Sequence, residues 1–143
     1  MPLPEPVPGR VIRYNFLWSD EARAGALEGK KDRPVVIVLA KKQENDDKLV
    51  FVTPITHSTP DDPERALPLP RKTALRLGLD EEPAWIIIGE LNKFIWSGPD
   101  IRPLPDAKDV WTYGDIPQQL FVDIQMAITR CQTHKKLRTS TPE

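Results

Sequence analysis

Prolines are the feature of this sequence that most restricts its fold. There are 16 of them among 143 residues, about twice the average usage of ~5%. Because proline lacks an amide hydrogen and fixes φ, it interrupts helices and the interior of sheets. The sequence therefore favours short strands, turns and proline-bounded loops over long helices.

Four segments predict strands from their β-branched and aromatic residues. The first is "RVIRYNFLW", which starts at Arg10 and alternates loosely. The second, Val35–Leu39, does not alternate, which indicates burial on both faces. "KLVFVTPIT" from Lys48 completes a hairpin with it, and "AWIIIGELNKFIW" predicts one further buried strand that turns polar at Glu90. The even-numbered residues of the first strand share a face: Ile12, Tyr14, Phe16 and Trp18.

The segment "GDIPQQLFVDIQMAITRCQ" predicts a C-terminal helix over residues 116–131. Asp115 is the expected N-cap, with Gln118 in a variant of the capping box and Pro117 in the first turn. The upstream segment "SDEARAGALEGKKD" predicts a flexible connector with one helical turn at most. The apolar residues of the long helix recur at helical spacing and should pack on the sheet: Leu120, Phe121, Ile124, Ala127, Ile128 and Cys131.

Length and composition predict a single domain over residues 9–132, with a proline-rich arm (1–8) before it and a basic, flexible tail (133–143) after it. No apolar run approaches the ~20 residues of a membrane span, and no segment has the pattern of a signal peptide. The lone Cys131 cannot form an intramolecular disulfide and is expected to be a small buried residue. We expect a cytoplasmic protein with no membrane contact.

Several enzyme classes are excluded by the residues that are missing. With only two histidines and no cysteine–histidine cluster, neither a structural zinc site nor a three-histidine catalytic site can be built. Glycine-rich phosphate loops and serine-hydrolase elbows are absent. No zinc site and no cofactor are therefore expected, and a formal net charge of −1 limits any attraction to nucleic acid to local patches.

Polar residues gather where the predicted strands begin and end. Antiparallel pairing of the hairpin places Arg33, before its first strand, beside Thr56, at the end of its second. A guanidinium next to a hydroxyl suits a phosphodiester, because the guanidinium donates two parallel hydrogen bonds and the hydroxyl a third. Further candidates for supporting or substrate-binding roles lie in the connector, after the hairpin and in the last strand: Lys30, Lys31, His57, Ser58, Glu90, Asn92 and Lys93.

The order and spacing of several segments resemble the MazF/PemK toxin family. These segments are "GRVIRYNFLW", "KKDRPVVIVLA", "VFVTPITHS", "GELNKFIW" and "YGDIP" followed by a helix, and they span about Gly9 to Ile128. The resemblance implies a mainly β fold with added α, built on a small SH3-like β-barrel with a C-terminal helix. It also implies a homodimer that cuts single-stranded RNA without a metal and is neutralised by an antitoxin protein.

Carried over by motif, the catalytic pair is Arg33 and Thr56. The resemblance implies that the 2′-hydroxyl attacks the neighbouring phosphate, which leaves a cyclic phosphate and a 5′-hydroxyl. Arg33 should stabilise the charge on the pentavalent phosphate, and since arginine is a poor proton acceptor the general base stays unassigned. His57 titrates near neutrality, but strand alternation points it away from Thr56, so we expect it to have only a supporting role. Lys30, Lys31 and Lys93 can contact flanking phosphates.

Other interpretations remain open from the sequence. Arg33 can instead form an ion pair with Asp32 or Glu90, or cap a strand end. The same barrel can bind a peptide or RNA without cleaving it. A gyrase poison of the CcdB type ranks last, because that family depends on an aromatic residue and a glycine near its C-terminus and this chain ends in "TSTPE".

Overall fold

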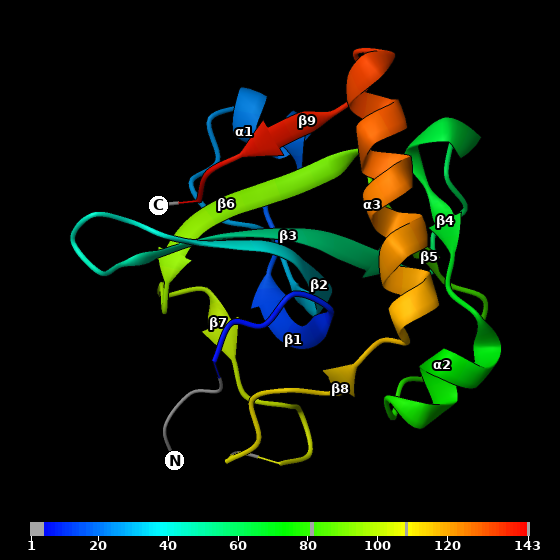
Figure 1. The fold of residues 1–143 in the computed structure, drawn as a ribbon, viewed down its shortest axis with the longest axis horizontal. Helices are drawn as coiled ribbons and strands as arrows, with labels where there is room; N and C mark the ends of the chain where they lie inside the picture. The colour runs from blue at the N-terminus through cyan, green and yellow to red at the C-terminus, as the bar shows by residue number, and fades with distance from the viewer. Residues whose placement is uncertain (1–4, 81, 108, 143) are drawn as a thin grey trace.

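A computed structural model describes residues 5–80, 82–107 and 109–142 of the chain (Figure 1). The fold is mainly antiparallel β with added helices, as the sequence predicted. The elements in chain order are β1 (Arg10–Asn15), α1 (Ser19–Arg23), β2 (Asp32–Lys42), β3 (Lys48–Thr56), the 3₁₀ turn η1 (Pro63–Arg65), β4 (Leu67–Pro68), α2 (Arg71–Arg76), β5 (Trp85–Ile86), β6 (Glu90–Trp96), β7 (Ile101–Arg102), β8 (Gly114–Asp115), α3 (Gln118–Thr133) and β9 (Arg138–Ser140).

The predicted hairpin forms the centre of the sheet. Strands β2 and β3 pair antiparallel, with Val36 opposite Thr53, and β1 pairs with the other edge of β2. Four consecutive residues of β2, from Val35 to Val38, are buried, because the strand has neighbours on both edges and packed side chains on both faces. This rigid centre determines where the ends of β2 and β3 meet.

The prediction of one continuous last strand is wrong, because this segment forms two strands, β5 and β6. Both β5 and β6 pair with the outer edge of β3, and residues 87–89 bulge between them. Pro54 lies in β3 opposite the interruption, and its missing amide hydrogen removes one ladder bond. Ile87 compensates: its N–H donates to the Pro54 carbonyl (2.9 Å), and its own carbonyl accepts from the Thr53 hydroxyl (2.7 Å).

The expected closure into a barrel is also wrong, because the strands described form an open sheet in the order β4-β5-β3-β2-β1-β7, with β6, β8 and β9 attached at its sides. After β1 the chain turns away toward α1, so it has no ladder with β6. Side chains bridge the gap instead. Leu17 exchanges two backbone hydrogen bonds with the Asn92 amide (2.8 and 2.7 Å), and Ser19 donates twice to the Glu90 carboxylate (2.8 and 2.6 Å).

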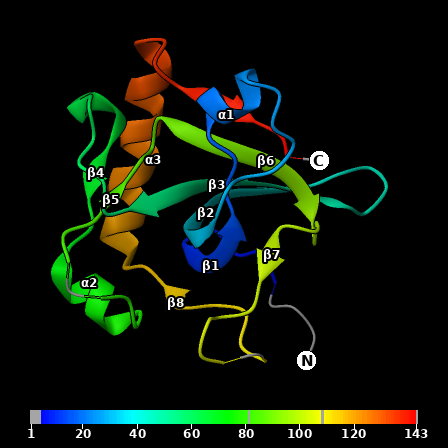
Figure 2. The same cartoon turned by 180° about the vertical axis from the view of Figure 1, so that it is seen from behind.

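Two apolar clusters cover the two faces of the sheet. One contains the predicted face of the first strand, with Ile12, Tyr14 and Phe16 buried and Trp18 packed against them. The other lies under α3, which crosses the sheet beside β4 and β5 (Figures 1 and 2). The predicted apolar stripe of this helix is confirmed, with four members buried and two half-buried: Leu120, Ile124, Ala127, Cys131, Phe121 and Ile128.

The start of α3 differs from the prediction. The helix runs from Gln118 to Thr133, and its N-cap is Pro117, which makes no side-chain capping hydrogen bond. Asp115 does not cap it, because this residue belongs to β8, opposite Arg10, and its carboxylate accepts from the Arg10 guanidinium at 3.0 Å. The short-range capping pattern was overridden by a strand pairing between residues far apart in the sequence.

The C-terminal tail contains a short strand that the sequence did not predict. Residues Arg138–Ser140 form β9, which pairs in parallel with β6 and lies beside α1 (Figures 1 and 2). Of the proline-rich arm, residues 1–4 fall outside the described part of the chain, and Pro6 is buried. Among the described helices, none is long and apolar enough to span a membrane.

Candidate functional site

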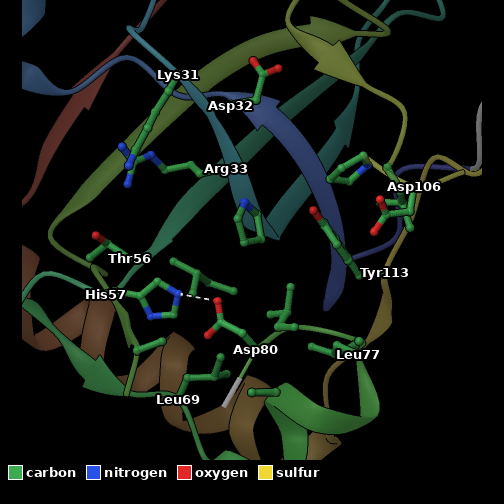
Figure 3. Close-up of a pocket in the computed structure, with 18 of the residues that line it drawn as sticks. Lys31, Asp32, Arg33, Thr56, His57, Leu69, Leu77, Asp80, Asp106 and Tyr113 are labelled. Carbon is green, nitrogen blue, oxygen red and sulfur yellow. Dashed lines mark hydrogen bonds and ion pairs between the residues drawn. The ribbon is translucent and has the colours of Figure 1, made fainter. Parts of the chain in front are cut away.

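The hairpin brings Arg33 and Thr56 together, as its antiparallel pairing predicted. Val35 pairs with Pro54. Arg33 lies two residues before Val35 and Thr56 two residues after Pro54, so both lie at the same end of the hairpin. Figure 3 shows the side chains of Lys31 and Arg33 pointing the same way, with their nitrogen ends together on the side where Thr56 lies. Two cations and a hydroxyl therefore face one space.

That space is a groove made of two cavities that meet at the hairpin end. The first has a volume of about 590 Å³ and the second about 520 Å³. Apolar residues from α2 and the loops around it, together with Tyr113, line the first cavity, whereas α1, residues 58–62 and β9 form the second. Four residues line both cavities and thus occupy the middle of the groove: Lys31, Arg33, Thr56 and Ser58.

The two carboxylates that the sequence offered as ion-pair partners of Arg33 are paired with other cations. Asp32 lies 3.6 Å from the Arg13 guanidinium and 3.8 Å from that of Arg102. Glu90 forms an ion pair with Arg65 at 2.8 Å. The ion-pair explanation of Arg33 is thus not supported by the structure.

Arg33 rests on an aromatic ring instead. Its guanidinium carbon lies 5.1 Å from the centre of the Trp18 ring, within the range of a cation–π contact. The Arg33 Nε is buried and has no hydrogen-bond partner within the described residues. Burial lowers the pKa of Arg33 below its ordinary value, and the nearby Glu21 opposes this shift only in part. Arg33 forms no ion pair within the described residues, so its partly desolvated guanidinium can be stabilised by an arriving anion.

Thr56 is oriented by its neighbour. The Ser58 N–H donates to the Thr56 hydroxyl oxygen at 3.2 Å. Because this bond uses the oxygen as an acceptor, the hydroxyl hydrogen is free to donate toward the groove. A Thr56 hydroxyl aimed at the same anion as Arg33 would supply the third donor that the sequence suggested.

His57 lines the first cavity, with its ring turned toward Asp80 (Figure 3). Its Nδ1 lies 2.9 Å from the Pro83 carbonyl oxygen, and its Nε2 lies 3.0 Å from an Asp80 carboxylate oxygen. Both partners accept hydrogen bonds only, so the ring satisfies both of them as the imidazolium. The Pro83 carbonyl and the Asp80 carboxylate accordingly raise the pKa of His57 above its ordinary value, against a smaller opposing effect of burial.

The remaining predicted site residues separate into three groups. Ser58 and Lys31 lie in the groove, whereas exposed Lys30 and half-buried Lys93 line neither of the two cavities. Glu90 is 5% exposed and Asn92 is fully buried. Their polar atoms bond the Leu17–Ser19 segment and Arg65, so both residues support the wall of the groove. Glu90 also lines the second cavity, where its carboxylate is engaged by Ser19 and Arg65.

One group of the described residues could hold a metal ion: the ligand atoms of His57, Asp80 and Glu82 lie within 4.8 Å of one another. In the structure the two His57 nitrogens are already engaged by Pro83 and Asp80. A metal would have to break one of these contacts. The ion pair between His57 and Asp80 explains the cluster without one.

Sequence reasoning missed two contributors to the groove. Trp18 was assigned to the apolar core, yet one face of its ring carries Arg33. Arg138 was assigned to a flexible tail, yet it lines the second cavity. The only sequence signals were an aromatic residue at the end of the first strand and a basic residue in the tail, and neither identifies a partner.

No protein-family model matches the chain, and no curated protein matches it. The groove holds the Arg33 guanidinium, the Lys31 amine, the Thr56 hydroxyl and the His57 ring, and its first cavity also contains the carboxylates of Asp32, Asp80 and Asp106. Cations and a hydroxyl donor in this arrangement can bind an anionic group such as a phosphate.

Proposed function

We propose that this protein is a sequence-selective, metal-independent endoribonuclease of the toxin–antitoxin type, with Arg33 and Thr56 as its catalytic pair. The observation that carries the proposal is the half-buried Arg33 guanidinium, which forms no ion pair among the residues that the structure describes and lies next to Thr56 in the middle of the groove. The resemblance of the chain to MazF/PemK toxins in the order of its sequence segments also supports RNA cleavage. The scissile phosphate would occupy the point where the two cavities meet.

The reaction breaks one bond of the phosphodiester and forms another. The 2′-oxygen of the upstream ribose attacks phosphorus, the bond from phosphorus to the 5′-oxygen breaks, and a 2′,3′-cyclic phosphate remains. The 2′-hydroxyl proton passes to solvent or a base that we leave unassigned, and the departing 5′-oxygen takes up a proton. Arg33 and Thr56 donate to the non-bridging oxygens, where negative charge builds up in the transition state.

The two cavities give the neighbouring nucleotides different environments. The first is lined mainly by apolar side chains and by Tyr113, and it has room for a base. The second is polar, and it suits the backbone of the flanking nucleotide. A groove of this kind also fits an acidic segment of an antitoxin, which would cover the cations and block the site. We propose, further, a homodimer that acts in the cytoplasm.

Cleavage in the presence of EDTA tests the proposal. The purified chain, without an inhibitor, is incubated with a long single-stranded RNA, and the fragments are sequenced. We expect cuts at a recurrent short motif, with no requirement for added metal. Intact RNA after prolonged incubation at high enzyme concentration would contradict the proposal.

A binding module without catalysis is the second candidate. The observation that favours it is His57: both ring nitrogens are engaged, so no free imidazole is available as a base beside Thr56. In this case the protein binds a single-stranded oligonucleotide or an acidic peptide and leaves RNA intact. Binding without cleavage, unchanged by Arg33→Ala, would select this candidate over the nuclease.

Replacing Trp18 should reduce cleavage without removing it. A cation–π contact contributes ~0.5–2 kcal/mol, so we expect Trp18→Leu to lower kcat/KM by about 2- to 30-fold. Trp18→Phe keeps an aromatic face under Arg33 and should retain most of the activity. Thermal melting of both variants separates this effect from a loss of packing. Equal kcat/KM values for the two variants would contradict a role of the ring in holding Arg33.

Binding of RNA should weaken as the pH rises through the raised pKa of His57. The imidazolium charge is fully present below the ordinary value of 6.5 and is lost above the raised pKa, so its attraction for phosphate disappears on the alkaline side. Fluorescence anisotropy of an uncleavable oligonucleotide from about pH 6 to 9 measures the effect. His57→Gln should bind more weakly at low pH and lose this dependence. An identical pH profile for both proteins would contradict the prediction.

A further inference from the structure

The second cavity has a wall that the hairpin does not supply. Strand β9 runs parallel to β6 with Arg138 opposite Glu90, and the Arg138 N–H donates to the Gly89 carbonyl at 2.9 Å. The neighbouring Ser140 is buried. The backbone of this short strand is therefore anchored, while the Arg138 side chain is exposed and lines the cavity.

Polar contacts fix the segment between α3 and β9. The Lys136 amine lies 2.8 Å from Asp62 and 3.2 Å from Glu64, and His134 lies 3.1 Å from the same Glu64 carboxylate. Arg65 donates to the Lys136 carbonyl at 3.0 Å while it pairs with Glu90. Because η1 and β6 are both held in this way, the tail has a defined position at the rim of the groove.

The charges of the second cavity favour an anion once internal pairs are set aside. Arg65 is neutralised by Glu90, and Asp62 is neutralised by Lys136, which lies outside the cavity. For Arg138 the described part of the chain offers no hydrogen-bond or ion-pair partner. The basic residues left in the lining are Arg23, Lys31, Arg33 and Arg138, and the acidic ones are Asp20 and Asp61.

We propose that Arg138 is a positioning residue that binds a backbone phosphate of the single-stranded RNA next to the scissile phosphate. Arg33 and Arg138 line the same cavity, so one strand that has its scissile phosphate at Arg33 passes Arg138 with the adjacent part of its backbone. A guanidinium can donate two hydrogen bonds to one phosphate. The C-terminal tail thus completes the substrate groove. This inference rests on the proposed function for the identity of the strand.

Binding and cleavage are measured separately, so that failure of the nuclease and failure of Arg138 are distinguishable. The probe for binding is a labelled single-stranded DNA of mixed sequence, which lacks the attacking 2′-hydroxyl. We compare the wild type with Arg138→Ala, Arg138→Gln and Arg138→Lys. The matched control is Lys41→Ala, which removes one exposed positive charge at the far end of the hairpin.

We expect Arg138→Ala and Arg138→Gln to weaken binding by about tenfold at low salt, in keeping with a hydrogen bond to a charged group. The slope of log K against log salt should fall by ~0.7, as expected when one contact with a single-stranded phosphate is lost. Arg138→Lys should retain part of the affinity. In cleavage assays KM should rise while kcat stays within about twofold, because the contact exists before and during the reaction.

The outcomes decide between the two proposals. Affinity and salt slope in Arg138→Ala equal to those of Lys41→Ala overturn the role of Arg138, whether or not the wild type cleaves RNA. Failure of the wild type to bind the oligonucleotide overturns it as well. A selective loss of binding in Arg138→Ala, with no cleavage by any of the proteins, supports the phosphate contact of Arg138. It rejects only the proposal that the protein is a nuclease.

Discussion

Replacing Arg33 by alanine is expected to lower the rate of RNA cleavage by about 10²- to 10³-fold, the usual effect of removing one preorganised donor to a developing oxyanion. The loss should appear in kcat as well as in kcat/KM, because the guanidinium interacts more strongly with the pentavalent phosphate than with the ground state. Single-turnover cleavage of a short RNA measures it.

Arg33→Lys is the informative companion variant. Lysine keeps the charge but not the planar pair of donors, so it should recover only a minor part of the rate. Lys41→Ala serves as the charge-matched control and should cleave like the wild type. Arg33 is half-buried on Trp18, and the thermal melt of each variant must therefore be compared with that of the wild type. Full activity of a folded Arg33→Ala protein would remove this residue from the mechanism.

Replacing Asn92 by alanine should cause the largest loss of stability among the predicted site residues. The Asn92 amide is fully buried and satisfies both the N–H and the carbonyl of Leu17. Without it, two backbone groups are buried unsatisfied, at ~1–3 kcal/mol each. We expect a loss of about 3 kcal/mol, which lowers Tm by about 10 °C in a domain of this size.

The same substitution at Asn45 is the control for Asn92→Ala. Asn45 lies in the exposed turn of the hairpin, and its hydrogen bonds to Asp47 face solvent, so Asn45→Ala should change the stability by less than about 1 kcal/mol. Denaturant unfolding followed by tryptophan fluorescence gives both values. Wild-type stability of Asn92→Ala together with reduced RNA binding would instead indicate that Asn92 contacts the substrate.

The central part of the site could be predicted because it depends on local pairing. A hairpin with a short polar turn fixes which residues lie opposite one another, so Arg33 beside Thr56 follows from the positions of two apolar runs. The apolar stripe of α3 was equally accessible, since 3.6-residue spacing survives wherever the helix packs. In both cases the information lies within one contiguous segment.

The rest of the site depends on contacts between segments that are distant in sequence. Glu90 and Asn92 were predicted only as polar residues within a strand, and the open gap between β1 and β6 makes them interior bridges. In the sequence Arg138 is only a basic residue of the tail, and its place in the groove depends on the pairing of β9 with β6. The Asp115 cap failed for the same reason, because the pairing of β8 with β1 competes with the helix for this residue.

The proposed attack by the 2′-hydroxyl is tested most directly with one RNA oligonucleotide in two forms. Once the cut position is known, the same sequence is made with a single 2′-deoxyribose immediately upstream of the scissile phosphate, and both are incubated with the protein in EDTA. We expect that only the all-RNA form is cut, with a 2′,3′-cyclic phosphate on one fragment and a 5′-hydroxyl on the other. Cleavage of the deoxy form, or fragments with 5′-phosphates, would contradict it.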